Sequence, residues 1–217
     1  MIPDLSPTVL RVDGLCFQYS QNALFSDLSA VIPPGVTLLQ GDEGAGKTSL
    51  MRLMAGEMEA LSGNFQINGI SLSDRPQTYR SQVFLADPRS EEFDSITPMD
   101  YWDTVQSRYP SFDSPLLADL TEAFSLKEHQ SKFLYMLSTG TKRKVWLAAA
   151  FACGATVTML DEPFAALDKL SSKWVLELLQ EAAAHRTRAW VVADYTAPFG
   201  VPLASIIKLP DGAGLAG

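Results

Sequence analysis

The sequence predicts an α/β fold built around a mostly parallel sheet. Short apolar runs suited to buried strands recur along the chain, at residues 36–40, 83–86, 156–160 and 189–193. Segments with helical spacing separate these runs. Strands that alternate with helices form parallel sheets whose two faces are both covered, which explains why the runs are apolar throughout. A chain of 217 residues is long enough for one such domain.

Turn residues and periodicity place the other elements. Further strands are expected over residues 9–19, 28–32 and 205–209, with a strand pair over 63–70. The pair is expected to turn at Asn68-Gly69, and Pro33-Pro34-Gly35 is expected to form a turn before the strand at 36–40. Helices are expected over residues 47–55, 99–108, 115–124, 142–153 and 170–184.

The middle of the chain differs in composition. Residues 88–132 are rich in Asp, Ser, Pro and aromatic residues, and they contain two of the expected helices. We interpret this segment as a helical insertion within a single domain of residues 1–217, with a helical subdomain at about 88–145. The Gly- and Ala-rich tail at 212–217 is expected to be disordered.

Charge and cysteine content exclude several classes of function. The chain has 17 Lys and Arg against 25 Asp and Glu, a net charge of −8, which disfavours binding to nucleic acid. Its two cysteines, Cys16 and Cys153, lack metal-ligand spacing and are interpreted as reduced thiols. Residues 1–7 do not resemble a signal peptide, and no apolar run reaches the ~20 residues that span a bilayer. If the protein acts at a membrane, we expect another chain to span it.

Residues 41–48, read as G-D-E-G-A-G-K-T, match the phosphate-loop motif G-x-x-x-x-G-K-[ST]. An expected strand precedes the motif and an expected helix follows it, as the motif requires. Its glycines let backbone N–H groups approach phosphate oxygens, Lys47 reaches the β- and γ-phosphates, and the Thr48 hydroxyl helps to hold Mg²⁺. The residues expected to bind nucleotide here are Gly41, Asp42, Glu43, Gly44, Ala45, Gly46, Lys47, Thr48 and Ser49.

A pair of acidic residues follows the apolar run at 156–160. Asp161 and Glu162 are expected at the carboxyl edge of the sheet, where the phosphate loop also lies. Asp161 suits Mg²⁺ binding, and Glu162 suits a catalytic role in orienting or deprotonating the attacking water. Taken alone, the pair is equally well explained as the acidic start of a helix before Pro163. Together with the phosphate loop, it favours a catalytic site.

The order and spacing of these motifs resemble the ATP-binding cassette (ABC) family. Residues 137–144 resemble the family's LSGGQ-like signature, residues 165–168 its D-loop, and Tyr19 the aromatic residue that stacks on adenine. The resemblance implies a P-loop NTPase (RecA-like) core with an antiparallel β subdomain and an α-helical subdomain. It also implies ATP and Mg²⁺ as ligands.

The family resemblance also implies partners. Two chains, either two copies or paralogous subunits, would sandwich two ATP molecules head to tail. Ser138, Gly140, Thr141 and Asp168 would then face the nucleotide of the opposite chain. A separate transmembrane permease subunit is expected, with this chain cytoplasmic and peripheral on the inner face of the cell membrane. The aromatic residues Tyr101, Trp102, Tyr109 and Phe112 are interpreted either as local core or as part of a groove for that subunit.

The sequence departs from the family pattern at four positions. Thr139 and Thr141 replace a glycine and a glutamine of the signature, which we expect to be tolerated. Asp87 stands near the place of a glutamine that senses Mg²⁺ in the family and is expected to bind the metal. Asp194 stands at the place of a histidine that contacts the γ-phosphate and is expected in the catalytic site. Because a carboxylate near a γ-phosphate repels it, we predict that ATP binds but is hydrolysed slowly.

Three functions fit these patterns. The leading hypothesis is an ATPase subunit that drives a membrane transporter. The second is a soluble cassette protein that acts without a membrane partner. The third is a degenerate, nucleotide-gated regulatory subunit with almost no turnover, which Asp87 and Asp194 favour. A kinase-type phosphate-loop protein would leave residues 137–144 unexplained.

Overall fold

The computed structural model describes residues 7–20, 22–87 and 91–210, and its centre is a parallel sheet. Five strands pair in the order β6-β7-β8-β3-β9, and the four pairings between them are all parallel. The strands are β3 (Gly35–Gln40), β6 (Val83–Ala86), β7 (Val157–Asp161), β8 (Ala189–Asp194) and β9 (Ser205–Lys208). The mostly parallel sheet expected from the sequence is therefore confirmed.

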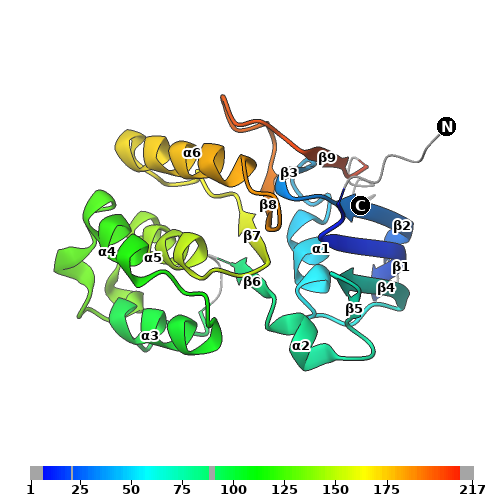
Figure 1. Cartoon of the computed structure of the whole chain (residues 1–217), viewed down its shortest axis with the longest axis horizontal. Coiled ribbons are helices and arrows are strands. Elements are labelled where there is room, and N and C mark those ends of the chain that lie inside the picture. The colour runs from blue at the N-terminus through cyan, green and yellow to red at the C-terminus, as the bar shows by residue number, and fades with distance from the viewer. Residues whose placement is uncertain (1–6, 21, 88–90, 211–217) are drawn as a thin grey trace.

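A second, antiparallel sheet packs beside the first, at the right of Figure 1. Its order is β2-β1-β4-β5, formed by β1 (Leu10–Tyr19), β2 (Asn22–Ile32), β4 (Ser62–Ile67) and β5 (Ile70–Ser71). The expected turn between β4 and β5 is present, with positive φ angles of 48° at Asn68 and 76° at Gly69.

Strand β2 begins at residue 22, well before the expected start at 28. Most of its first half is exposed, and Asp27 adopts a positive φ of 61°, so this half of the strand shows no regular apolar alternation. Pairing with β1 forms this part of the strand, and such pairing leaves little trace in a single sequence.

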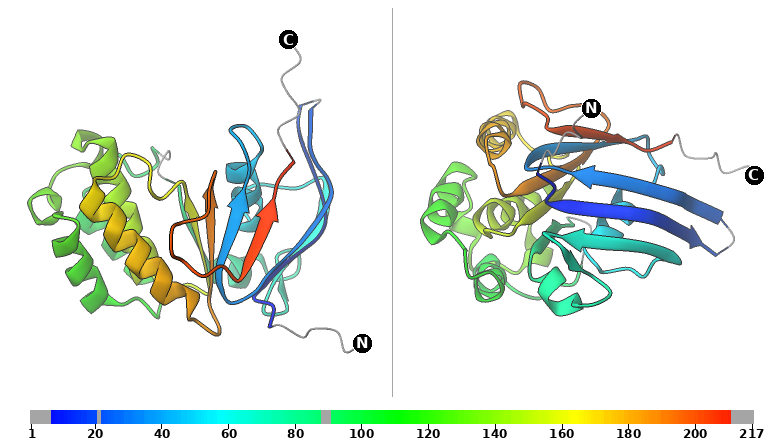
Figure 2. Two further views of the ribbon diagram at one scale, coloured as in Figure 1. Left: turned by 90° about the horizontal axis from the view of Figure 1, so that it is seen from above. Right: turned by 45° about the vertical axis from the view of Figure 1, so that its right-hand side comes forward.

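Helix α1 (Lys47–Met54) lies between the two sheets, as Figure 1 and the left view of Figure 2 show. Leu50, Met51, Leu53 and Met54 are buried on it. A short helix that the sequence patterns did not indicate, α2 (Pro76–Arg80), packs below it. Its buried Tyr79 donates a hydrogen bond to the carbonyl oxygen of Met54 at 2.7 Å, which ties α2 to the end of α1.

Four further helices cover the other face of the parallel sheet or extend from it, at the left of Figure 1. They are α3 (Pro98–Arg108), α4 (Ser114–Ala123), α5 (Thr139–Ala152) and α6 (Lys169–Ala183). Two 3₁₀ turns, Lys127–His129 and Leu134–Met136, connect α4 to α5. Helix α5 begins three residues before the expected 142, because the Ser138 side chain accepts a hydrogen bond from the Thr141 N–H and caps it.

The strand β8 shows how the core determines this arrangement. Ala189, Val191 and Ala193 are buried in the cluster that contains α1 and the antiparallel sheet. Trp190 and Val192 are buried in the other cluster, with α5 and α6. Both faces of this strand are therefore apolar, and its one polar side chain, Asp194, stands at its end.

Within the described residues, no helix is long and apolar enough to cross a bilayer. The expectations for residues 1–7 and for the tail at 212–217 concern residues that, apart from residue 7, lie outside the described part of the chain.

Candidate functional site

The phosphate loop connects β3 to α1, and its geometry requires glycine. Gly46 has a φ of 93°, and a Cβ atom there would lie 2.9 Å from Leu24 Cδ2 and 3.0 Å from Phe25 Cζ. Gly44 also has a positive φ, of 77°. Side chains at these two positions would strain the backbone or push into β2, so the loop can turn tightly only with glycine.

Lys47 is the first residue of α1, and its side chain folds back into the phosphate loop. Its Nζ atom donates hydrogen bonds to the carbonyl oxygens of Gly41 at 2.7 Å and Asp42 at 2.9 Å. The same atom lies 4.3 Å from the centroid of the Tyr195 ring. With only 6% of its surface exposed, the lysine is held by contacts within the site.

Thr48 and Asp161 join the phosphate loop to the acidic pair. The Thr48 Oγ1 atom donates a hydrogen bond of 2.6 Å to Asp161 Oδ2. Asp161 ends β7 and is 4% exposed. A hydroxyl and a carboxylate at hydrogen-bonding distance are hard oxygen donors, which are the ligands that Mg²⁺ prefers. These two residues therefore fit the magnesium site expected from the sequence.

Glu162 has an unusual backbone conformation, with a φ of 46°. Its N–H donates to the carbonyl oxygen of Ala193 at 2.9 Å, and its carbonyl oxygen accepts from Arg143 Nη1 at 3.0 Å. The same Arg143 atom donates to the carbonyl oxygen of Ala165 at 2.6 Å. A non-glycine residue in this region of φ persists only where the surroundings fix it, which these hydrogen bonds do.

These residues surround a hollow of about 380 Å³. Tyr19 forms part of its wall, with its hydroxyl 3.1 Å from Ser49 Oγ and its ring edge-to-face with Phe17 at 4.9 Å. The hollow is lined by Tyr19, Leu24, Glu43, Gly44, Gly46, Lys47, Thr48, Ser49, Glu162 and Tyr195. The structure thus brings together the expected adenine-stacking residue, most of the phosphate loop and the expected general base.

Asp194 is not among the described residues that line this hollow. It pairs with Gln40 at the ends of β8 and β3, and its Oδ1 atom accepts a hydrogen bond from the Tyr195 N–H at 2.7 Å. Burial raises the pKa of the Asp194 carboxyl, and the nearby negative charge of Glu162 raises it further. The side chain that reaches the hollow from this loop is Tyr195, which was not predicted as a site residue.

The signature residues lie away from the hollow of their own chain. Ser138 Oγ accepts from the Thr141 N–H at 3.1 Å, and neither residue lines the hollow in the described structure. Gly140 packs so tightly that a Cβ atom there would lie 2.5 Å from the carbonyl oxygen of Ala166. Thr139, in place of the usual glycine, begins α5 in an exposed position, so its branched side chain has room.

Asp168 caps helix α6 and contacts the signature helix. Its Oδ1 atom accepts from the Ser171 N–H at 2.8 Å, and its Oδ2 atom lies 2.6 Å from Lys144 Nζ. The hydrogen bond from Lys144, together with those from Ser171, holds the pKa of this carboxyl well below its usual range. Arg143 and Lys144 thus tie α5 to the segment after β7. Their position within the signature-like segment 137–144 was the only sequence signal for this role.

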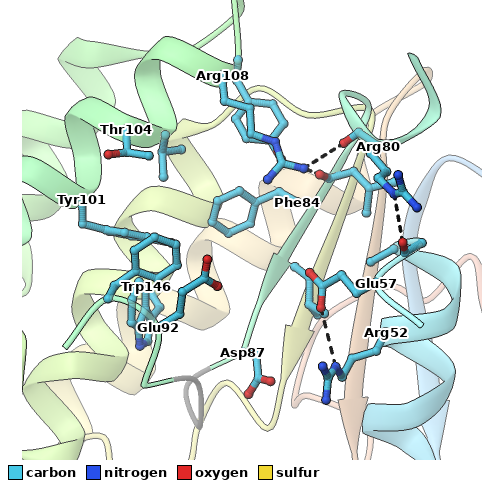
Figure 3. A pocket seen from close by; sticks show the side chains of 17 residues that line it. Arg52, Glu57, Arg80, Phe84, Asp87, Glu92, Tyr101, Thr104, Arg108 and Trp146 are labelled. Carbon is cyan, nitrogen blue, oxygen red and sulfur yellow. Dashed lines mark hydrogen bonds and ion pairs between the residues drawn. The ribbon is translucent and has the colours of Figure 1, made fainter. Parts of the chain in front are cut away.

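Asp87 lies at a second and larger cavity, of about 540 Å³, which Figure 3 shows. Asp87 is not among the described residues that line the nucleotide hollow, whereas Thr48 is. Arg52 Nε lies 3.6 Å from Glu57 Oε2 in this cavity, and burial raises the pKa of Glu57, an effect that Arg52 opposes. Charged residues from both sides and aromatic residues of the helical part line it; these include Arg52, Glu57, Arg80, Asp87, Glu92, Tyr101, Arg108, Tyr109 and Trp146.

The fold and site together define a P-loop nucleotide-binding protein. Residues 25–165, more than half of the chain, match the family model described as ABC transporter. The chain therefore belongs to the ABC transporter family, as an ATP-binding subunit of an import or export system. Members of this family are generally ATPases.

Individual relatives agree with this assignment. A manganese transport system ATP-binding protein from Synechocystis sp. is 28% identical over 83% of this chain and 73% of its own length. A cytochrome c biogenesis ATP-binding export protein from Yersinia pseudotuberculosis is 33% identical over 81% of each chain. A solved structure described as the ATP-binding subunit of an ABC transporter has a TM-score of 0.83 at 27% identity, covering 94% of this chain and 87% of that chain.

The position of Asp194 generates a pH prediction. Its pKa is raised in the folded protein, so the ionised carboxylate is less favourable there than in the unfolded chain. Asp194→Asn keeps an oxygen to accept the Tyr195 N–H and removes the charge. We expect the unfolding free energy of the variant, relative to that of the wild type, to increase as pH rises from about 4 to about 7.

Urea unfolding at several pH values measures this difference. The control is Asp119→Asn, the same change at an exposed position on α4, for which we expect no such trend. A difference for Asp194→Asn that is constant with pH, or that shrinks as pH rises, would contradict the raised pKa.

Proposed function

We propose that this chain hydrolyses ATP and thereby drives a separate transmembrane subunit of its transport system. The observation that carries the proposal is the 2.6 Å hydrogen bond between Thr48 Oγ1 and Asp161 Oδ2. It joins the phosphate loop to the carboxylate at the end of β7, beside the hollow that Lys47 and Glu162 also line. Phosphoryl transfer needs these groups in one place.

In this proposal the hollow holds ATP along its length. The adenine ring packs on Tyr19, which the Ser49 hydroxyl and Phe17 hold in place. The phosphates lie on the N–H groups of residues 44–47, at the positive end of α1. The Lys47 ammonium exchanges its carbonyl partners, Gly41 and Asp42, for phosphate oxygens.

Thr48 and Asp161 would hold Mg²⁺, which when bound supplies positive charge that offsets the charge of the phosphates. Binding of Mg²⁺ by Asp87, as a third metal-binding residue, stays a prediction, because Asp87 lines the larger cavity and not the nucleotide hollow.

Glu162 orients the attacking water and accepts its proton at the carboxylate. Its backbone is fixed on one side by the Ala193 carbonyl oxygen and on the other by Arg143, so the point from which its side chain leaves the backbone is set before nucleotide binds. Pre-positioning of this kind lowers the entropic cost of reaching the transition state. Asp194 stays in this proposal as a residue close to the reacting phosphate that slows hydrolysis by its negative charge.

The proposal includes dimerisation around ATP. The Ser138 hydroxyl and the N–H groups of Gly140 and Thr141 stand at the N-terminus of α5, which favours an anion, and they lie outside the hollow of their own chain. A second copy, or a paralogous subunit, would bring its ATP to them. Asp168, at the start of α6, would lie beside the same nucleotide.

The transmembrane subunit is proposed to dock at the second cavity shown in Figure 3. Residues of α1, such as Arg52, and of α3, such as Tyr101 and Arg108, line it together, so a helix bound there would contact both parts of the chain. This position extends the groove interpretation of the aromatic residues, although Tyr101, Trp102 and Tyr109 are also well buried.

Co-purification with an integral membrane chain tests this partner, and persistent isolation of the protein without one would contradict it.

The catalytic role of Glu162 gives the main functional prediction. Glu162→Gln keeps the shape of the side chain and removes the base, so we expect steady-state ATP turnover to fall by about 10²-fold or more while ATP still binds. Turnover by the purified chain, measured as phosphate release, tests this. Glu128→Gln, on the exposed turn after α4, is the matched control and is expected to leave turnover unchanged.

Two results would contradict parts of this account. Turnover by Glu162→Gln equal to that of the wild type would remove Glu162 from the mechanism. A wild type that binds ATP without measurable turnover, but turns over after Asp194→His, would favour the nucleotide-gated regulatory subunit instead.

A further inference from the structure

The aromatic ring of Tyr195 lies beside the lysine of the phosphate loop. Its ring centroid lies 4.3 Å from Lys47 Nζ, and the ring lines the hollow together with Glu162. Tyr19, the expected adenine platform, is positioned separately through Ser49. The hollow therefore has a second aromatic residue, and its ring lies over the Lys47 ammonium that would bind the terminal phosphates of ATP.

Two hydrogen bonds hold the backbone of Tyr195 in this position. Gln40 Nε2 donates to the Tyr195 carbonyl oxygen at 2.9 Å, and the Tyr195 N–H donates to Asp194 Oδ1 at 2.7 Å. Gln40 is the last residue of β3, directly before the phosphate loop, and it pairs in register with Asp194. The carboxylate of Asp194 is thus engaged with its own loop, while the next side chain reaches the nucleotide hollow.

The Lys47 ammonium has three N–H donors. Two of its contacts are the carbonyl oxygens of Gly41 and Asp42, and the Tyr195 ring is a third. An ammonium over an aromatic face is stabilised most when water is excluded, and Lys47 is only 6% exposed. Phosphate oxygens can bind the ammonium only by replacing some of these contacts.

We propose that Tyr195 is a positioning residue that acts through Lys47. Its ring holds the ammonium in the phosphate loop before nucleotide binds, and it competes with the terminal phosphate for that ammonium. The inference rests on the proposed binding of ATP in this hollow, and it adds a residue that sets the affinity for the triphosphate. ADP has no γ-phosphate to compete with the ring for the Lys47 ammonium, so the affinity for ADP depends less on Tyr195.

Equilibrium binding of ATP and ADP, measured without Mg²⁺ to prevent turnover, tests this role. Tyr195→Leu keeps apolar bulk and loses the aromatic face, so we expect its Kd for ATP to fall by about two- to thirtyfold. Its Kd for ADP should fall by less. Tyr195→Phe keeps the ring and should bind ATP like the wild type. Tyr195 is 44% exposed, so these substitutions leave the core intact, and Tyr135→Leu at a 60% exposed position is the matched control.

Three outcomes would overturn the proposal: unchanged ATP binding by Tyr195→Leu, weaker ATP binding by that variant, or equally tightened binding by Tyr195→Phe. The first means that the ring does not compete, the second that it contacts the nucleotide favourably, and the third that the hydroxyl is responsible. A wild type that fails to bind ATP would instead overturn the proposed function itself. If the wild type binds ATP and Lys47→Ala does not, ATP occupies this hollow as proposed. Failure of the Tyr195 variants then contradicts only the role of Tyr195.

Discussion

The hydrogen bond between Thr48 and Asp161 is the contact on which the rest of the site depends. It links the second residue of α1 to the last residue of β7, which are 113 positions apart in the sequence. Helix α1 is packed between two sheets, and β7 lies inside the parallel sheet, so neither partner can shift without disturbing the core. The pair of oxygens is therefore a fixed point, around which the phosphate loop and Glu162 are arranged.

Contacts from the signature helix reach the same place. Arg143 of α5 donates to the carbonyl oxygens of Glu162 and Ala165, and Lys144 of the same helix pairs with Asp168. The segment after β7 is thus attached to the helix whose N-terminus carries the signature. A movement of α5 relative to the parallel sheet would alter the surroundings of Glu162. This connection gives a physical route between the helical part of the chain and the hydrolytic residues.

Much of the fold and the centre of the site follow from the sequence, because both depend on local patterns. Strand β8 is apolar on both faces and was recognisable as buried, and Gly46, Lys47 and Thr48 belong to a motif with fixed spacing. The first half of β2 and the short helix α2 were missed, since pairing and a single buried tyrosine, Tyr79, define them. Asp194 was expected to lie near the phosphate, and this stays a prediction; the direction of its side chain depends on the Tyr195 N–H. Only the folded chain supplies that partner, which is also why Tyr195 was overlooked.

The structure of the Glu162→Gln variant with Mg²⁺ and ATP tests the central claim most directly. The account predicts adenine against Tyr19, the terminal phosphates on Lys47, and Mg²⁺ on the oxygens of Thr48 and Asp161. It also predicts that the Lys47 ammonium has left the Gly41 and Asp42 carbonyl oxygens that it contacts now. Nucleotide bound outside this hollow, or bound with Lys47 still in its present contacts, would contradict the account.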